Sequence, residues 1–161
     1  MSKRVLITGG NKGIGLAVSR AMLEFGYEVI IVARDFDTCP IVGVKNVTAI
    51  EYDLSDVDGL PELAKTVGNI DILINNAGYM QPKYTYNNYP KDAREHIMNV
   101  DLYTPVELMN IFCEHMKKQK YGRIVNTASI AGQIGHPDVW YGIAKAGLIN
   151  ATKIYGKMLG S

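Results

Sequence analysis

The sequence predicts an α/β fold, a doubly wound parallel β-sheet with strand order 3-2-1-4-5 and helices on both faces. Short apolar, β-branched runs alternate along the chain with longer stretches of helical spacing, and this alternation is typical of such a sheet. The length of 161 residues, with 47% apolar and 20% charged residues, fits one globular domain spanning residues 1–161.

Five short runs are the predicted strands. Because the runs are apolar on both faces, we expect them to be buried in the sheet, as parallel strands usually are. In chain order they are RVLIT (4–8), EVIIVA (28–33), VTAIEY (47–52), DILIN (71–75) and RIVNTA (123–128).

Helices are predicted between these runs. The first is amphipathic, with Gly26 as its stop signal, and its apolar stripe consists of Ile14, Ala17, Val18, Ala21, Met22 and Phe25. The link at 35–46 contains Pro40 and Gly43 and is too short for an ordinary crossover helix, so we expect a loop or a single turn there. Further helices are expected at about 56–67, 88–99, 101–118 and 139–158, the last starting just after Asp138.

The charge and the cysteines argue against several kinds of function. A formal net charge of +1 provides no field for nucleic acid or for an anionic membrane. Cys39 and Cys113 match no metal or thiol motif, so we expect no metal site and two thiols in a reducing compartment. Neither a signal peptide nor an apolar segment of 18 residues is visible, which makes the cytoplasm the expected location.

A glycine-rich turn, TGGNKGIG, joins the first predicted strand to the first predicted helix. Gly9 allows a tight turn, Gly13 lets backbone amides approach an anion, and Gly15 lets the helix pack closely on the sheet. The helix N-terminus then faces a pyrophosphate, so the turn predicts dinucleotide binding; a turn that binds nothing is the alternative. The residues of this turn expected to bind the cofactor are Gly9, Asn11, Lys12, Gly13, Ile14 and Gly15.

The residues at the end of the second predicted strand are expected to discriminate between NADP and NAD. An acidic residue there binds the ribose 2′-hydroxyl, whereas an arginine accommodates a 2′-phosphate. Arg34 is the first residue after the strand, and Lys12 adds a second cation nearby, so NADP(H) is favoured. Asp35 follows directly, which keeps NAD(H) open, and both cations are also compatible with an ordinary solvated surface.

A tyrosine and a lysine one helical turn apart, Tyr141 and Lys145, open the last predicted helix. The same spacing recurs at Tyr79 and Lys83, but Pro82 lies between those two residues and nothing fixes their side chains together. Only the pair at 141 and 145 can face the carboxyl ends of the strands, where ligands bind in open α/β sheets.

In order and spacing these motifs resemble the short-chain dehydrogenase/reductase family over essentially the whole chain. The glycine turn matches TGxxxGxG, and the segment after the fourth strand reads NNAG, as in the family. The resemblance implies a Rossmann-like fold and assigns cofactor contacts to Asp53, Leu54, Asn76, Ala77, Gly78, Tyr141 and Lys145, and catalytic roles to Asn99, Ser129, Tyr141 and Lys145.

The implied reaction interconverts a carbonyl and a secondary alcohol with NADP(H). Tyr141 would be the general acid/base, with its pKa lowered by the Lys145 ammonium, and Lys145 would also hold the nicotinamide ribose. Ser129 would polarise the substrate oxygen, and Asn99 would belong to a proton relay. The alternatives are a dinucleotide-binding regulatory or inactive fragment without turnover, and, less in keeping with the glycine spacing, a sugar-nucleotide epimerase or dehydratase.

The chain departs from the family in its length. Family members continue past this point with two more strands and a substrate-covering segment, so we expect the 161 residues to be a fragment or the ordered part of a longer protein. The resemblance also implies a homodimer or homotetramer through the helices at about 101–118 and 139–158. The apolar stripe that suits this contact, part of which core packing would also explain, consists of Leu148, Ala151, Ile154, Tyr155 and Met158.

Overall fold

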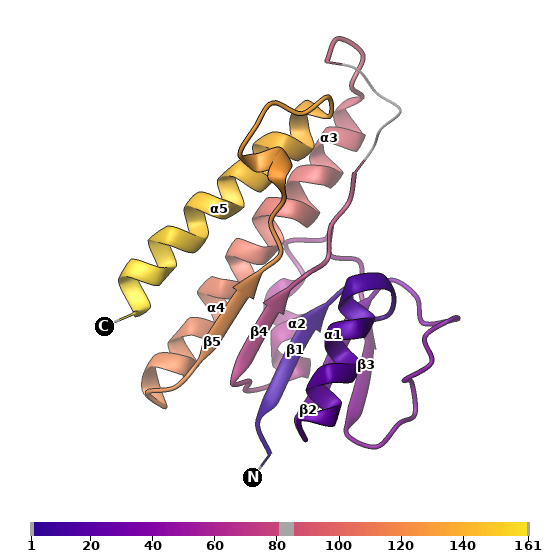
Figure 1. The fold of residues 1–161 in the computed structure, drawn as a ribbon, viewed down its shortest axis with the longest axis vertical. Helices are drawn as coiled ribbons and strands as arrows, with labels where there is room; N and C mark the ends of the chain where they lie inside the picture. Colours follow the sequence, from indigo (N-terminus) through magenta and orange to yellow (C-terminus); the bar gives the residue numbers. More distant parts are fainter. Residues whose placement is uncertain (1, 81–85, 161) are drawn as a thin grey trace.

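A computed structural model describes residues 2–80 and 86–160, and these residues form a five-stranded parallel sheet with the order β3-β2-β1-β4-β5. The predicted Rossmann-like α/β fold and strand order are therefore confirmed. The chain leaves β1 in one direction toward β3 and returns to the other side for β4, so the order reverses between β1 and β4 (Figure 1). The strands are β1 (Arg4–Thr8), β2 (Glu28–Ala33), β3 (Val47–Glu51), β4 (Ile72–Asn75) and β5 (Arg123–Asn126).

Helices cover both faces of this sheet, with α1 on one side and α2, α4 and α5 on the other (Figure 1). Alternate residues of the strands point to opposite faces, so Leu6 and Leu73 pack beneath the three-helix side, whereas Ile7 and Ile31 pack beneath α1. The helices of this framework are α1 (Gly13–Glu24), α2 (Leu60–Val67), α4 (Thr104–Lys118) and α5 (Val139–Leu159).

The predicted buried stripe of α1 is wrong in part. Ile14 and Phe25 are 70% and 78% exposed, and the residues that pack on the sheet are Leu16, Val18, Met22 and Leu23. The helix is rotated because Gly15 and Ser19 are its buried residues, and their small side chains allow it to approach the sheet closely. Gly26, with a φ of 81°, follows the C-cap as predicted.

The prediction that all five strands are buried holds for β1, β2 and β4 but is wrong for the outer strands. Thr48 and Ala49 of β3 are exposed, and Val125 of β5 is 51% exposed. Both strands lie at edges of the sheet that the described residues form, so each has a neighbouring strand on one side only. An apolar run therefore predicts a strand more securely than it predicts burial.

Two separately predicted helices form one continuous helical path. The helix α3 (Lys91–Met98) passes into a π-helical turn, η1 (Asn99–Tyr103), which leads directly into α4. Within η1 the Thr104 amide bonds to the Asn99 carbonyl, five residues back, and Pro105 follows with no N–H to donate. The expected break between 99 and 101 is thus a wider turn rather than an interruption.

The remaining helix boundaries agree more closely with expectation. No helix interrupts the link at 34–46, as predicted, and α2 begins later than position 56, at Leu60. The last helix begins where it was expected, because the Asp138 carboxylate accepts the Tyr141 amide at 3.1 Å and caps it. No helix in the described ranges 2–80 and 86–160 is both long and apolar enough to span a membrane.

Candidate active site

The glycine turn after β1 has the geometry that its sequence predicts. Gly9 and Gly13 have φ values of 66° and 55°, a region that favours glycine. A Cβ on Gly15 would collide with the backbone carbonyl oxygen of Gly9. The first turn of α1 can therefore lie against the glycine turn only because position 15 has no side chain.

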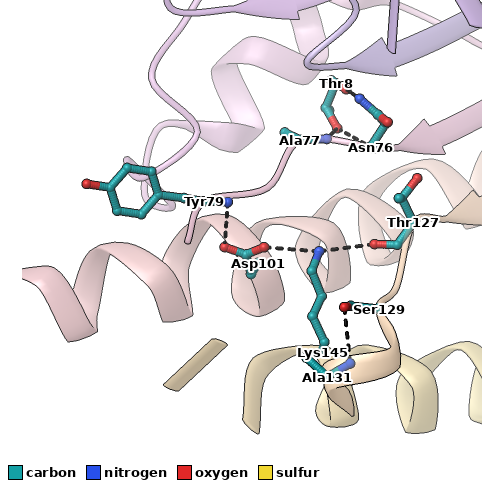
Figure 2. Close-up of polar contacts among 9 residues, drawn as sticks. All are labelled: Thr8, Asn76, Ala77, Tyr79, Asp101, Thr127, Ser129, Ala131 and Lys145. Atoms are coloured by element: carbon teal, nitrogen blue, oxygen red, sulfur yellow. Dashed lines mark hydrogen bonds and ion pairs between the residues drawn. The ribbon is translucent and has the colours of Figure 1, made fainter. Parts of the chain in front are cut away.

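The end of β4 is fastened to this turn by Thr8 and Asn76. The Thr8 hydroxyl accepts the backbone amides of Asn76 and Ala77 at 3.0 and 3.1 Å (Figure 2). The Asn76 side chain donates to the carbonyls of Thr8 and Gly9 at 3.1 and 3.3 Å. On the other side, the Asn11 side chain donates to the Asp35 carbonyl at 2.9 Å and fixes the turn to the end of β2. These hydrogen bonds thus join the ends of β1, β2 and β4 to one another.

A cleft of about 380 Å³ runs along the carboxyl ends of the strands. It crosses the point between β1 and β4 where the strand order reverses, which is where open α/β sheets bind their ligands. The predicted site residues that line it are Gly9, Asn11, Lys12, Ile14, Gly15, Arg34, Asp53, Leu54, Asn76, Ala77, Gly78, Tyr141 and Lys145.

Charged and phenolic groups line the part of the cleft beyond β2 and β3. Lys12, Arg34 and Asp35 are all exposed there, so two cations and one carboxylate are accessible from the cleft. Asp53 accepts the Ser55 amide and hydroxyl, each at 2.9 Å, and these hydrogen bonds lower the pKa of its carboxyl. Burial and the nearby Asp56 carboxylate raise the pKa of Tyr52 to about 12, so this phenol stays protonated.

Tyr141 and Lys145 lie at the other end of the same cleft. Both are on the first turns of α5, and the Lys145 Nζ lies 5.7 Å from the centre of the Tyr141 ring. Lys145 is only 2% exposed, whereas Tyr141 is half-buried. The spacing of four therefore brings the two side chains to one place, as predicted.

The Lys145 ammonium has a partner that the sequence did not predict, the carboxylate of Asp101 in η1. Its Nζ lies 3.0 Å from Asp101 Oδ1 and donates to the Thr127 carbonyl at 3.0 Å (Figure 2). Asp101 is fully buried, and its other oxygen accepts the Tyr79 amide at 2.9 Å. Burial raises the pKa of Asp101, and the Lys145 ammonium opposes that rise. One sequence signal was available, a single acid between the apolar residues Val100 and Leu102.

Three predicted site residues do not line the cleft. The Ser129 hydroxyl accepts the Ala131 amide at 3.1 Å and caps the short helix η2 (Ile130–Gly132). The Asn99 side chain donates to the Ser55 carbonyl at 2.9 Å, which joins η1 to the segment after β3. Gly13 is exposed in the glycine turn.

No group of three or more His, Cys, Asp or Glu side chains could hold a metal ion within the part of the chain that the structure describes. The second tyrosine-lysine spacing, Tyr79 with Lys83, cannot be compared with the first, since Lys83 and Pro82 lie outside the described residues.

The structure is a Rossmann-like α/β fold with a cleft at the switch point of its sheet, the place where such sheets bind their ligands. The chain belongs to the short chain dehydrogenase family, whose model matches residues 3–160. It is 34% identical over 166 residues to the uncharacterized oxidoreductase YxjF of Bacillus subtilis (strain 168), a match that covers 96% of this chain and 64% of YxjF. It is 32% identical to an acetoacetyl-CoA reductase of Shinella zoogloeoides, with 95% of this chain and 66% of that protein covered.

Solved structures agree with this assignment. A metagenomic short-chain oxidoreductase in complex with NADP has a TM-score of 0.91 and 27% identity, with 98% of this chain and 75% of that chain covered. A 4-hydroxyisoleucine dehydrogenase complexed with NADH has a TM-score of 0.90 and 27% identity, covering 99% of this chain and 68% of that one. The chain thus spans about two thirds of the length of the relatives that it matches.

Proposed function

We propose that this protein is an NADP(H)-dependent oxidoreductase that interconverts a carbonyl and a secondary alcohol. One observation carries the proposal. The glycine turn, the NNAG segment, Tyr141 and Lys145 line a single cleft, so a nucleotide held at one end would present its reactive end to the phenol and the ammonium at the other.

The residues of the cleft fit a nicotinamide dinucleotide. The N-cap residue of α1, Lys12, makes no side-chain hydrogen bond to the start of the helix, so the amides there can bind a pyrophosphate. Lys12 and Arg34 suit a 2′-phosphate, which favours NADP(H), although Asp35 and the NADH-bound relative keep NAD(H) open. Asp53 and Leu54 line the cleft where the adenine is expected, and Ala77 and Gly78 line its middle.

Each reactive residue has a separate task in the proposed reaction. The bound dinucleotide supplies or accepts the hydride. Tyr141 gives a proton to the carbonyl oxygen, or takes one from the alcohol, and the positive charge of Lys145 favours its phenolate form. Lys145 also holds the nicotinamide ribose, Ser129 donates a hydrogen bond to the substrate oxygen, and Asn99 belongs to the path that returns protons from solvent.

Replacement of the phenol tests this proposal. Tyr141→Phe removes the proton donor and little else, so we expect the rate of carbonyl reduction with NADPH to fall at least about 100-fold while NADPH binding changes less than about threefold. The measurement is NADPH oxidation with a panel of ketones and aldehydes, beside a fluorescence titration of NADPH. A wild-type protein that binds NADPH but reduces no member of the panel would contradict the proposal.

Dinucleotide binding without turnover is the second candidate. It is favoured by the positions of Ser129 and Asn99, whose side chains bond to backbone groups and do not line the cleft. The same experiment separates the two candidates. In a protein that only binds the dinucleotide, Tyr141→Phe would change neither NADPH oxidation nor NADPH binding.

We also propose that the protein assembles through α4 and α5. Ile154 and Met158 on α5 are 47% and 63% exposed, whereas Leu148 is buried in the core, so only part of the predicted stripe is available for a partner. Sedimentation at the monomer mass would contradict the assembly.

Cys39 and Cys113 are free thiols, the state expected in a reducing compartment such as the cytoplasm.

A further inference from the structure

We propose that Asp101 is a positioning residue for Lys145, whose buried carboxylate keeps the Lys145 ammonium charged and holds it beside the cleft. This inference rests on the proposed function, because it concerns the side chain that would hold the ribose and act on Tyr141. It assigns a role to a residue that does not itself line the cleft.

The burial of the pair requires such a partner. Lys145 is 2% exposed and Asp101 is 0% exposed, and their charged atoms are 3.0 Å apart. An ammonium taken out of water without an opposite charge tends to lose its proton, and loss of one partner of a buried ion pair leaves the other uncompensated. The carboxylate is thus the group that allows a charged lysine at this depth.

The contacts of Lys145 hold its ammonium beside the cleft. Its Nζ donates a hydrogen bond to the Thr127 carbonyl and forms an ion pair with Asp101 (Figure 2). An ammonium has three N–H donors, and the Lys145 side chain also lines the cleft. The ammonium is therefore held in place before a ligand binds, which lowers the entropic cost of binding.

Two further features connect the ion pair to the cleft wall. The second oxygen of Asp101 accepts the Tyr79 amide, which follows the NNAG segment directly. A Cβ on Gly78 would lie 3.1 Å from Asp101 Oδ1 and 3.5 Å from Lys145 Nζ. The pair therefore lies directly beneath a glycine of the predicted nucleotide site, and a side chain on Gly78 would crowd it.

The π-helical turn explains how an acid reaches this position. In η1 the Thr104 amide bonds to Asn99, so the turn holds one residue more than an α-helical turn. The wider turn packs against α5, which carries Lys145. Other titratable groups around the pair are Tyr79, His96 on α3 and Tyr141 on α5.

The test is a pH titration of the Lys145 side chain followed by NMR, which requires no catalytic turnover. The protein is labelled with ¹³C-lysine, and the Lys145 resonance is assigned with Lys145→Met. In Asp101→Asn the amide oxygen can still accept the Tyr79 amide, but the charge is gone, so we expect Lys145 to lose its proton about one pH unit or more below wild type. Glu107→Gln, the same charge change at an exposed site on α4, is the control and should leave the titration unchanged. A Lys145 titration in Asp101→Asn that matches wild type overturns the proposal.

Kinetics supply a second readout. We expect kcat for carbonyl reduction in Asp101→Asn to fall about tenfold or more while KM for the carbonyl changes less than about threefold. Because loss of folded protein would also lower kcat without changing KM, kcat is expressed per folded protein, with the folded fraction taken from the circular dichroism of each sample. A kcat equal to wild type counts against the role. If the wild-type protein reduces no carbonyl, but Lys145 still loses its proton at a lower pH in Asp101→Asn than in wild type, the proposed function fails and this inference stands.

A variant that fails to fold is also informative. In that case Lys145→Met is compared with the double variant Asp101→Asn/Lys145→Met by urea unfolding. We expect the double variant to be the more stable of the two, because it no longer buries an unpaired carboxylate. A double variant less stable than Lys145→Met overturns the proposed pairing.

Discussion

Three charged side chains, Lys12, Arg34 and Asp35, lie in the part of the cleft where the adenosine ribose is expected. Lys12 and Arg34 come from different segments, the glycine turn and the end of β2, and both line the cleft. Asp35 lies beside them, and its backbone carbonyl is held by Asn11. The two cations and the carboxylate act in opposite directions on a 2′-phosphate, so the preference depends on which contacts the ribose.

Replacement of Arg34 tests this preference. A charge-assisted bond between a guanidinium and a phosphate contributes about 1.5–3 kcal/mol, so we expect Arg34→Ala to weaken NADPH binding about tenfold or more and NADH binding less than about threefold. Fluorescence titration of both cofactors measures the difference. Arg20→Ala removes an equal charge from an exposed position on α1 that does not line the cleft, and it is the control. If Arg34→Ala weakened the binding of NADPH and NADH equally, Arg34 would not be the residue that recognises the 2′-phosphate.

Residues were predictable from the sequence when their signal was local. The glycine turn, the end of β2 and the pair of Tyr141 with Lys145 each occupy a short segment, and the cleft brings these segments together. Asp101 was not predicted, because its contact with Lys145 depends on the π-helical register of η1 and on the packing of η1 against α5. Neither can be read from residue spacing.

At the scale of helices and strands, the sequence predicted which elements exist better than which faces they bury. The apolar stripe of α1 was misplaced because Gly15 and Ser19, which carry little apolar surface, determine its contact with the sheet. The start of α5 was predictable because Asp138 caps it through a local hydrogen bond. Interactions within one turn are encoded locally, whereas the buried face depends on the neighbour.

The cap of α5 leads to a prediction about stability. Asp138 is 3% exposed, and one carboxylate oxygen accepts both the Tyr141 amide and the Tyr89 hydroxyl at 3.1 Å. We expect Asp138→Ala to lower the free energy of unfolding by about 1–2 kcal/mol, measured in urea, because the first turn of α5 loses its cap. The turn that would loosen carries Tyr141, so turnover should fall as well. Asp138→Asn keeps an acceptor and should retain most of the stability; equal losses in both variants would argue against capping.

At the scale of the whole molecule, the strand order was predictable because doubly wound parallel sheets follow few topologies. The exposure of β3 and β5 was not, since it depends on what lies beside the outer strands. Between α4, α5 and β5 there is a further hollow of about 850 Å³, lined in part by Met109, Met116 and Tyr155. The attachment of α5 to this side of the sheet therefore depends on the residues of α5 that do pack in the core, such as Leu148.

Leu148 is the residue through which this attachment can be measured. It lies on α5, the helix that carries Tyr141 and Lys145, is 1% exposed, and packs in the same cluster as Leu108 and Met109 of α4. Removal of a buried leucine side chain typically costs about 2–5 kcal/mol, so we expect Leu148→Ala to lower the free energy of unfolding by that amount in urea.

The matched control for Leu148 lies on the same helix. Ile143 is 47% exposed, and Ile143→Ala should change the free energy of unfolding by less than about 0.5 kcal/mol. Because NADPH would bind only where α5 is docked on the sheet, saturating NADPH should recover part of the stability lost in Leu148→Ala. An equal, small effect of both substitutions would mean that α5 is held mainly by its polar first turns, through the Asp138 cap and the pair of Lys145 with Asp101, rather than by its apolar face.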